Sequence, residues 1–92
     1  MAVYVDDMRA PFGRMIMCHM GADTLVELHR MAGMLGIQRK WFQCPPKASW
    51  PHYDISLGKR GLAVKYGAVE ITQRQMVSVS NTLLREWVLA NK

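Results

Sequence analysis

The sequence predicts a small single-domain α/β sandwich, with α+β as the alternative, in which about three helices pack on a short sheet of about three strands. Short runs of β-branched, aromatic and other apolar residues alternate along the chain with segments of helical periodicity. The 92 residues fit one domain, and half of them are hydrophobic, which is enough to form a core. We therefore treat residues 1–92 as one folding unit.

The first twenty residues predict two strands separated by a loop. Val3–Val5 is β-branched and aromatic, which favours a short strand. Asp6–Arg14 contains a proline and a glycine and is expected to be a loop. Met15–Met20 is apolar at both odd and even positions, with His19 among the odd ones. A strand with two apolar faces is expected to be central and covered on both sides.

The segment Ala22–Gly36 has the clearest helical pattern. Thr24 and Glu27 have the spacing of a capping box, and Gly36 is a natural C-terminal stop. His29 follows a residue of the apolar stripe and is expected at its margin.

The middle of the chain carries weaker signals. Ile37–Gln43 mixes basic and aromatic residues and is expected to be a strand or a loop, with Trp41 and Phe42 filling the core. Cys44–Pro51 contains three prolines and is expected to be irregular.

The C-terminal third predicts helix, strand and helix. Ser56–Gly67 resembles a helix whose first residue is the N-cap and whose last is the stop. Ala68–Thr72 alternates like a short strand. The last helix, Thr72–Lys92, begins with a capping box that uses Gln75, and it is expected to pack on the sheet or on a second subunit.

Charge and cysteine content limit the classes of partner. The formal net charge is +5 and the pI is near 9.6, so phosphates, nucleotides, nucleic acid or an acidic protein are the natural partners. Cys18 and Cys44 have no zinc-binding spacing, which favours free thiols in a reducing cytoplasm. No signal peptide and no membrane anchor are expected. The methionine-rich apolar composition would suit a homo-oligomer interface.

Carboxylates and histidines near the ends of predicted elements form the first candidate site. Asp6, His19, His52 and Asp54 could hold a divalent metal or supply a general acid and base. The competing interpretation is structural, in which Asp6 satisfies loop amides and Asp54 or Ser56 caps the following helix.

A basic cluster at the predicted helix start forms the second candidate, an anion site. Free N–H groups at a helix start attract phosphate, and four cationic side chains could join them: Arg14, His52, Lys59 and Arg60. Tyr53 could stack on a base, while Asp6 and Asp54 could select polar groups. The competing interpretation is a solvated helix face. Binding of nucleic acid is less favoured, because the chain has no dense basic tract and no recognisable module.

The chain also resembles a known family of small prokaryotic and phage proteins. The motifs that carry the resemblance are VYVDD, GRMIMCHM, DTLVELHRMAGMLGI, HYD and KRGLAVKYGAVEIT. They resemble the family called domain of unknown function 4031, over Val3 to about Thr72, so residues 1–72 form the family-like part and residues 73–92 a separate C-terminal helix. The resemblance implies one compact domain in a bacterial or phage-infected cytoplasm, and it implies no activity.

Three functional hypotheses follow. The leading one is a phage-type accessory protein that binds a phosphate-bearing ligand, a nucleotide, without turnover, and sequesters a host signal. The alternative is a metal-dependent hydrolase or nuclease built on Asp6, His19, His52 and Asp54. The third is an inhibitor that binds a host protein through the apolar surface.

Overall fold

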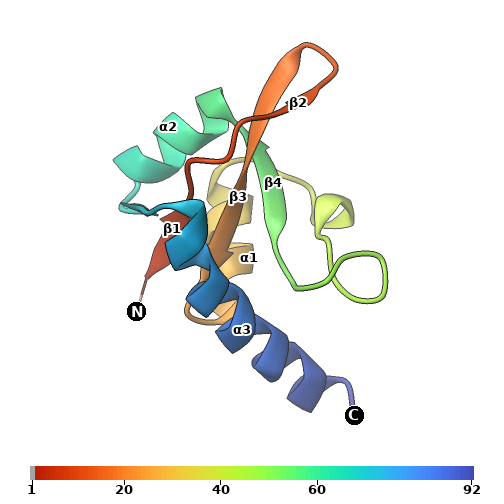
Figure 1. The fold of residues 1–92 in the computed structure, drawn as a ribbon. Helices are drawn as coiled ribbons and strands as arrows, with labels where there is room; N and C mark the ends of the chain where they lie inside the picture. Colours follow the sequence, from red (N-terminus) through yellow and green to blue (C-terminus); the bar gives the residue numbers. More distant parts are fainter. Residues whose placement is uncertain (1) are drawn as a thin grey trace.

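A mixed sheet of five strands forms the centre of the fold, with helices on both of its faces. The computed structural model describes residues 2–92. Figure 1 shows α3 in front of the sheet and α1 behind it. The elements are β1 (Val3–Val5), β2 (Ala10–Phe12), β3 (Met15–Ala22), α1 (Leu25–Met34), a short 3-10 helix (Arg39–Trp41), β4 (Tyr53–Ser56), α2 (Leu57–Lys65), β5 (Val69–Glu70) and α3 (Gln73–Ala90). The predicted α/β class is confirmed.

Strand β3 is the central strand, as its two apolar faces predicted. It pairs antiparallel with β1, β2 and β4, and β1 pairs in parallel with β5. Two of these strands were not expected. The predicted loop Asp6–Arg14 contains β2, in which Pro11 is tolerated because the strand lies at the edge of the sheet. The strand β4 (Tyr53–Ser56) lies directly before the second helix, where no strand was predicted.

The two faces of β3 meet different helices. Cys18, Met20 and Ala22 are fully buried in the core together with Leu28 of α1. Gly21 points the other way, and a methyl group on it would come within 2.8 Å of Val79 Cγ1 in α3. The missing side chain at this position therefore lets α3 approach the sheet closely.

Helix α1 begins and ends where the pattern predicted, although its cap differs in detail. The Thr24 hydroxyl accepts from the Glu27 N–H at 3.2 Å, but the Glu27 carboxylate accepts from that hydroxyl rather than from the backbone. Only half of the expected capping box forms. The Glu86 carboxylate of α3 accepts from the Leu25 N–H at 2.7 Å, which ties the two helices together. Gly36 ends the helix with a φ of 74°.

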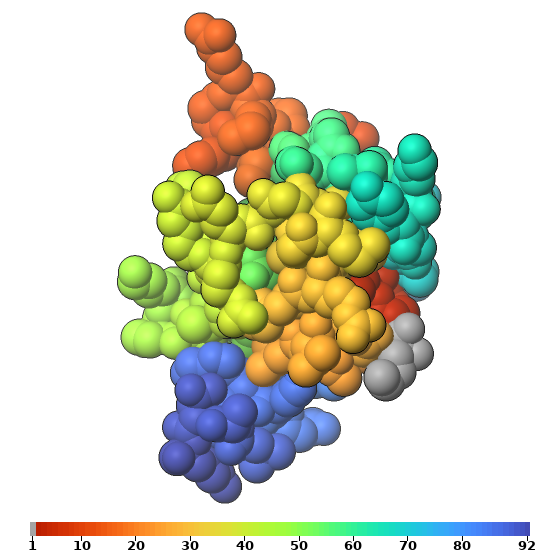
Figure 2. All heavy atoms as spheres, turned by 180° about the vertical axis from the view of Figure 1, so that it is seen from behind, coloured from red at the N-terminus to blue at the C-terminus, as the bar shows by residue number. Residues whose placement is uncertain are grey.

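The other two helices follow their predicted caps. Ser56 accepts from the Lys59 N–H at 3.3 Å at the start of α2, and α3 begins with the complete capping box of Thr72 and Gln75. Met76 and Leu83 of α3 are buried, so this helix packs on the domain. Figure 2 shows its C-terminal end projecting opposite to the hairpin of β2 and β3.

The segment before β4 corrects one prediction about the core. Trp41 lies in the 3-10 helix and is 59% exposed, so it does not fill the core. Phe42 is half-buried and packs against the rings of His29 and Tyr53. Cys44–Pro51 contains no helix or strand, as its prolines predicted. Within residues 2–92, no helix combines the length and the apolar character that a bilayer crossing requires.

Candidate metal centre

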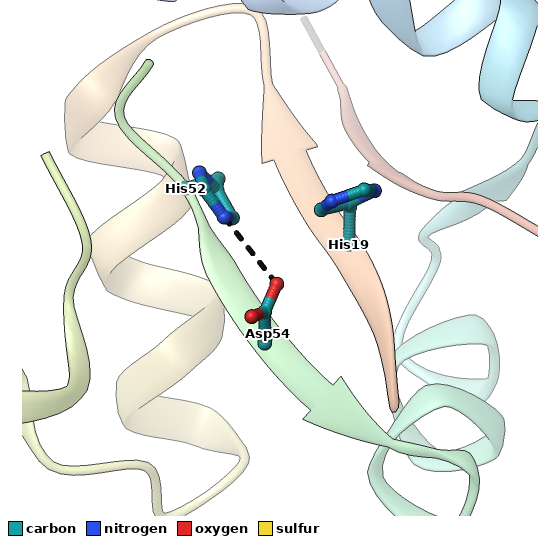
Figure 3. A group of neighbouring side chains, drawn as sticks. All are labelled: His19, His52 and Asp54. Atoms are coloured by element: carbon teal, nitrogen blue, oxygen red, sulfur yellow. Dashed lines mark ion pairs between the residues drawn. The ribbon is translucent and has the colours of Figure 1, made fainter. Parts of the chain in front are cut away.

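Strand register brings three metal-ligating side chains together on one face of the sheet. His19 of β3 is paired with Asp54 of β4, so both side chains point to the same face. His52 precedes Asp54 by two residues and shares that face. One ring nitrogen of each histidine and one oxygen of Asp54 lie within 4.8 Å of one another, as Figure 3 illustrates.

The buried carboxylate of Asp6 orients the ring of His19. The Nδ1 of His19 donates to Asp6 Oδ2 at 2.7 Å, while Asp6 Oδ1 accepts from the backbone N–H groups of His19 and Met8. Burial disfavours the charge of Asp6, but these hydrogen bonds outweigh burial and lower its pKa. The same hydrogen bond raises the pKa of His19 against the opposing effect of burial. Because Nδ1 carries the hydrogen, the neutral ring of His19 keeps a free lone pair on Nε2.

A backbone carbonyl orients the ring of His52 in the same way. The Nδ1 of His52 lies 2.8 Å from the carbonyl oxygen of Trp50. A carbonyl oxygen can only accept, so Nδ1 carries the hydrogen and Nε2 of the neutral ring has a free lone pair. That Nε2 lies 3.3 Å from Asp54 Oδ1, which is an ion-pair distance if His52 gains a second proton.

Asp54 has one satisfied and one unsatisfied oxygen. Its Oδ2 accepts from the side-chain amide of Gln43 at 2.9 Å, because Gln43 pairs with His52 beside it. Its Oδ1 is buried and has no hydrogen-bond partner in the described part of the chain. Burial works against the charge of this group, but the neighbouring His52 and the Gln43 amide outweigh it and lower the pKa of Asp54.

With both imidazole rings neutral, the arrangement presents acceptors without donors. Two imidazole lone pairs and one carboxylate oxygen converge, and a cation is the species that would satisfy all three. Two nitrogens and one oxygen suit Zn²⁺ and other divalent transition metals. The side chains of His19 and Asp54 are 25% and 32% exposed, so the site is open to water. Asp6 accepts from the ring of His19 in the way that carboxylates commonly orient metal-binding histidines.

A hollow of about 220 Å³ lies beside His19. The loop before β4 and the first half of α3 contribute to its wall. Its lining residues are Asp6, His19, Trp50, Gln73, Met76, Val77 and Ser80. The indole of Trp50 also stacks on His52, with ring centroids 4.4 Å apart. The hollow therefore adjoins the candidate ligands.

The residues of the predicted anion site are engaged elsewhere. Lys59 donates through Nζ to the carbonyl oxygen of Leu35 at 2.6 Å. Arg60 donates to the carbonyl oxygen of Asp6 at 2.9 Å and forms an ion pair with Glu70 at 2.7 Å.

The other members of that set are separated from these two cations. Arg14 is exposed in the turn between β2 and β3. His52 lies beside Asp54, on the face of the sheet that carries the candidate ligands. Asp54 does not cap α2, because Ser56 is the N-cap of that helix.

Tyr53 and His29 lie on the opposite face of the sheet. Tyr53 is 1% exposed, and its hydroxyl lies 2.9 Å from Nδ1 of His29. Burial raises the pKa of Tyr53, and burial followed by the charge of Arg39 lowers the pKa of His29. The expectation that Tyr53 stacks on a bound base does not fit this position, because a core residue presents no face to a ligand.

Two residues near the site escaped the sequence interpretation. Gln43 reaches Asp54 only because an isolated bridge pairs it with His52. Trp50 reaches His52 from an irregular loop, where no periodicity indicates direction. One signal was available for the ligands, since residues two apart on a strand share a face and His52 and Asp54 have that spacing.

Comparison with known proteins identifies the family. The model of the family described as "Protein of unknown function (DUF4031)" matches residues 3–83. The match includes all four residues of the site and extends past Thr72 into α3, which the sequence interpretation had left outside the family-like part. No curated protein and no solved structure matches the chain. A match over this much of the chain establishes that the protein belongs to the DUF4031 family.

Proposed function

We propose that the protein is a divalent-metal-dependent hydrolase whose ligands are His19, His52 and Asp54. The observation that carries the proposal is the buried Oδ1 of Asp54, which has no hydrogen-bond partner among the described residues and lies 3.3 Å from Nε2 of His52. Leaving a buried carboxylate oxygen unsatisfied costs about 1–3 kcal/mol or more, and a bound cation would remove that cost.

The number of ligands favours catalysis over a structural role. Structural zinc sites are commonly closed by four protein ligands, whereas catalytic sites use three and leave a position for water or substrate. A Zn²⁺ ion held this way would supply a water molecule whose pKa is lowered to about 7. Asp6 would keep Nε2 of His19 directed at the ion, and the carbonyl of Trp50 would do the same for His52.

The phosphate-binding hypothesis has less support. The predicted phosphate-binding residues on α2 are Lys59 and Arg60, which already donate to Leu35, Asp6 and Glu70. A nucleotide phosphate would have to displace these bonds, whereas a metal ion at the proposed site would replace only the contact between His52 and Asp54. Metal binding by a hydrolase is therefore the better-supported hypothesis.

Calorimetric titration of the chelator-treated protein with Zn²⁺, Mn²⁺ and Mg²⁺ tests the proposed ligand set. We expect one transition-metal ion per chain at neutral pH, and loss of that binding in His52→Ala and Asp54→Asn. His29→Gln is the matched control, because His29 lies on the opposite face and should leave binding unchanged. Absence of binding, or equal loss in the control, would overturn the proposal.

Hydrolysis is tested separately on the metal-loaded protein. Chromogenic carboxylic esters, amides and phosphodiesters provide the substrates, and cleavage should disappear in Asp54→Asn. If the protein binds metal but cleaves none of these substrates, the proposed metal site stands and the proposed hydrolysis is wrong.

A further inference from the structure

We infer that the hollow beside His19 binds a neutral, ring-sized apolar group, so that the substrates are uncharged esters or amides rather than phosphodiesters. The inference rests on the proposed hydrolase function and specifies its substrate class. It assigns Trp50 and the first half of α3 to substrate recognition.

The lining of the hollow is suited to an apolar group. Trp50, Met76 and Val77 supply apolar surface, and Gln73 and Ser80 supply neutral polar groups. No lysine or arginine lines it within the described chain. An apolar cavity of about 150 Å³ holds benzene, so a hollow of about 220 Å³ has room for a phenyl-sized group.

Two backbone donors near the hollow that could bind an anion are already bonded. The N-terminus of α3 adjoins the hollow, but the Gln73 N–H donates to the carboxylate of Asp7 at 2.9 Å. The Gln75 N–H donates to the Thr72 hydroxyl at 3.1 Å. The helix end therefore offers a phosphate a neighbouring negative charge, and two of its first three N–H groups are already bonded.

Arg60 is similarly unavailable. Its Nε donates to the carbonyl oxygen of Asp6, and its Nη1 pairs with Glu70. A phosphodiester in the hollow would meet the carboxylate of Asp6, and no lysine or arginine in the lining would hold its non-bridging oxygens. This is the reverse of the field that nuclease sites use to attract nucleic acid.

Trp50 connects the hollow to the proposed ligands. Its ring stacks on His52 and lies 5.7 Å from the centroid of His19. Gly21 beneath it has no side chain, and a methyl group there would lie 3.3 Å from the indole. A group packed against this ring would be held beside the imidazoles of His52 and His19.

Hydroxamates of different side groups test the inference on the zinc-loaded protein. We expect benzohydroxamate to bind about 10- to 100-fold more tightly than acetohydroxamate, because the phenyl ring enters the hollow. Succinic monohydroxamate, which ends in a carboxylate, should bind no more tightly than acetohydroxamate. Equal affinity of the phenyl and methyl compounds, or tightest binding of the carboxylate compound, would overturn the inference.

A charge introduced into the wall adds a test that does not depend on removing Trp50. Val77 lines the hollow and is 57% exposed, so Val77→Lys should fold and should favour succinic monohydroxamate over acetohydroxamate. Val88→Lys is the matched control on the same helix, because Val88 is exposed outside this hollow. Equal effects of the two substitutions would contradict the assignment of the hollow.

A metal-free experiment separates this inference from the proposed function. Benzamide, as a neutral probe, should shift the backbone amide NMR signals of Val77 and Ser80 more than benzoate does. If zinc does not bind but benzamide shifts these signals as expected, the hydrolase proposal is wrong and the assignment of an apolar site stands. Stronger shifts by benzoate, or none by benzamide, would overturn the apolar site whatever the zinc titration gives.

Discussion

His19 and Asp54 lie directly opposite each other in the antiparallel ladder of β3 and β4. Directly opposed residues in such a ladder have Cβ atoms about 4.5–5.5 Å apart, so the pairing itself brings an imidazole to a carboxylate. The site is consequently part of the sheet, and its geometry depends on register. A shift of β4 by one residue would send Asp54 and His52 to the opposite face.

The carboxylate of Asp6 should control both metal affinity and stability. Asp6→Asn removes the charge and replaces one acceptor with a donor, at a group that accepts from His19 twice and from Met8. We expect metal affinity to fall about 10- to 100-fold and the free energy of unfolding to fall by about 1–3 kcal/mol. Calorimetry and urea denaturation measure the two effects. Asp7→Asn is the control for affinity, and an unchanged affinity in Asp6→Asn would contradict the proposed role.

His29 should make the protein less stable in acid. Its pKa is lowered by burial and by Arg39, whereas the unfolded chain has the ordinary value of about 6.5. The unfolded state therefore binds the proton first, and the free energy of unfolding falls as the pH drops below about 6.5 toward the folded pKa. Urea denaturation across this range should show a smaller acid loss in His29→Gln than in the wild-type protein.

His19 should act with the opposite sign in the metal-free protein. The hydrogen bond to Asp6 raises its pKa, so its contribution is full below about 6.5 and is lost as the pH rises through the folded value. His19→Gln should therefore lose more stability on acidification than the wild-type protein loses. Parallel pH dependences in this variant, His29→Gln and the wild-type protein would refute both sign assignments.

The close approach of α3 to the sheet should depend on Gly21. Gly21→Ala would place a methyl group 2.8 Å from Val79 Cγ1 and 3.2 Å from Met76 Sδ. We expect a loss of about 1–3 kcal/mol in the free energy of unfolding, because overpacking forces neighbours to move. Gly33→Ala is the matched comparison, since nothing lies within 4 Å of a methyl group there and the helix should gain about 0.5–1 kcal/mol. Thermal denaturation of both variants measures the contrast.

Helix α3 should be essential to the domain. Leu83 is fully buried, and Leu83→Ala should cost about 2–5 kcal/mol through lost contacts and a cavity. Leu89 on the same helix is 62% exposed, and Leu89→Ala should change stability by no more than about 0.5 kcal/mol. Equal losses measured by urea denaturation would mean that the two faces of α3 do not differ as described.

Local signals in the sequence were sufficient for most of the fold. The three helices follow capping residues and apolar spacing within a few residues, and β1 and β3 follow β-branched or apolar runs. The strands β2 and β4 were missed because each is short and adjoins prolines or a helix cap. Their existence depends on pairing with β3, and pairing depends on residues distant in sequence.

The site was predictable in its chemistry and not in its geometry. Asp6, His19, His52 and Asp54 were selected because carboxylates and imidazoles are ligands and proton carriers. Their convergence depends on the register of β3 with β4, which no local pattern specifies. The residues of the predicted phosphate site do not assemble, because Lys59 and Arg60 donate to backbone and carboxylate groups that are distant in sequence. No local pattern specifies those partners either.

The group that orients His52 is the main-chain oxygen of Trp50, whereas the group that stacks on His52 is the Trp50 side chain. A mutation at position 50 replaces the ring and leaves the oxygen. Evolution can therefore vary the shape of the hollow at this position while the tautomer of its neighbouring histidine stays the same. Under the proposed function, position 50 would thus separate the choice of substrate from the hold on the metal, and relatives with another side chain there are expected to differ in the first property alone.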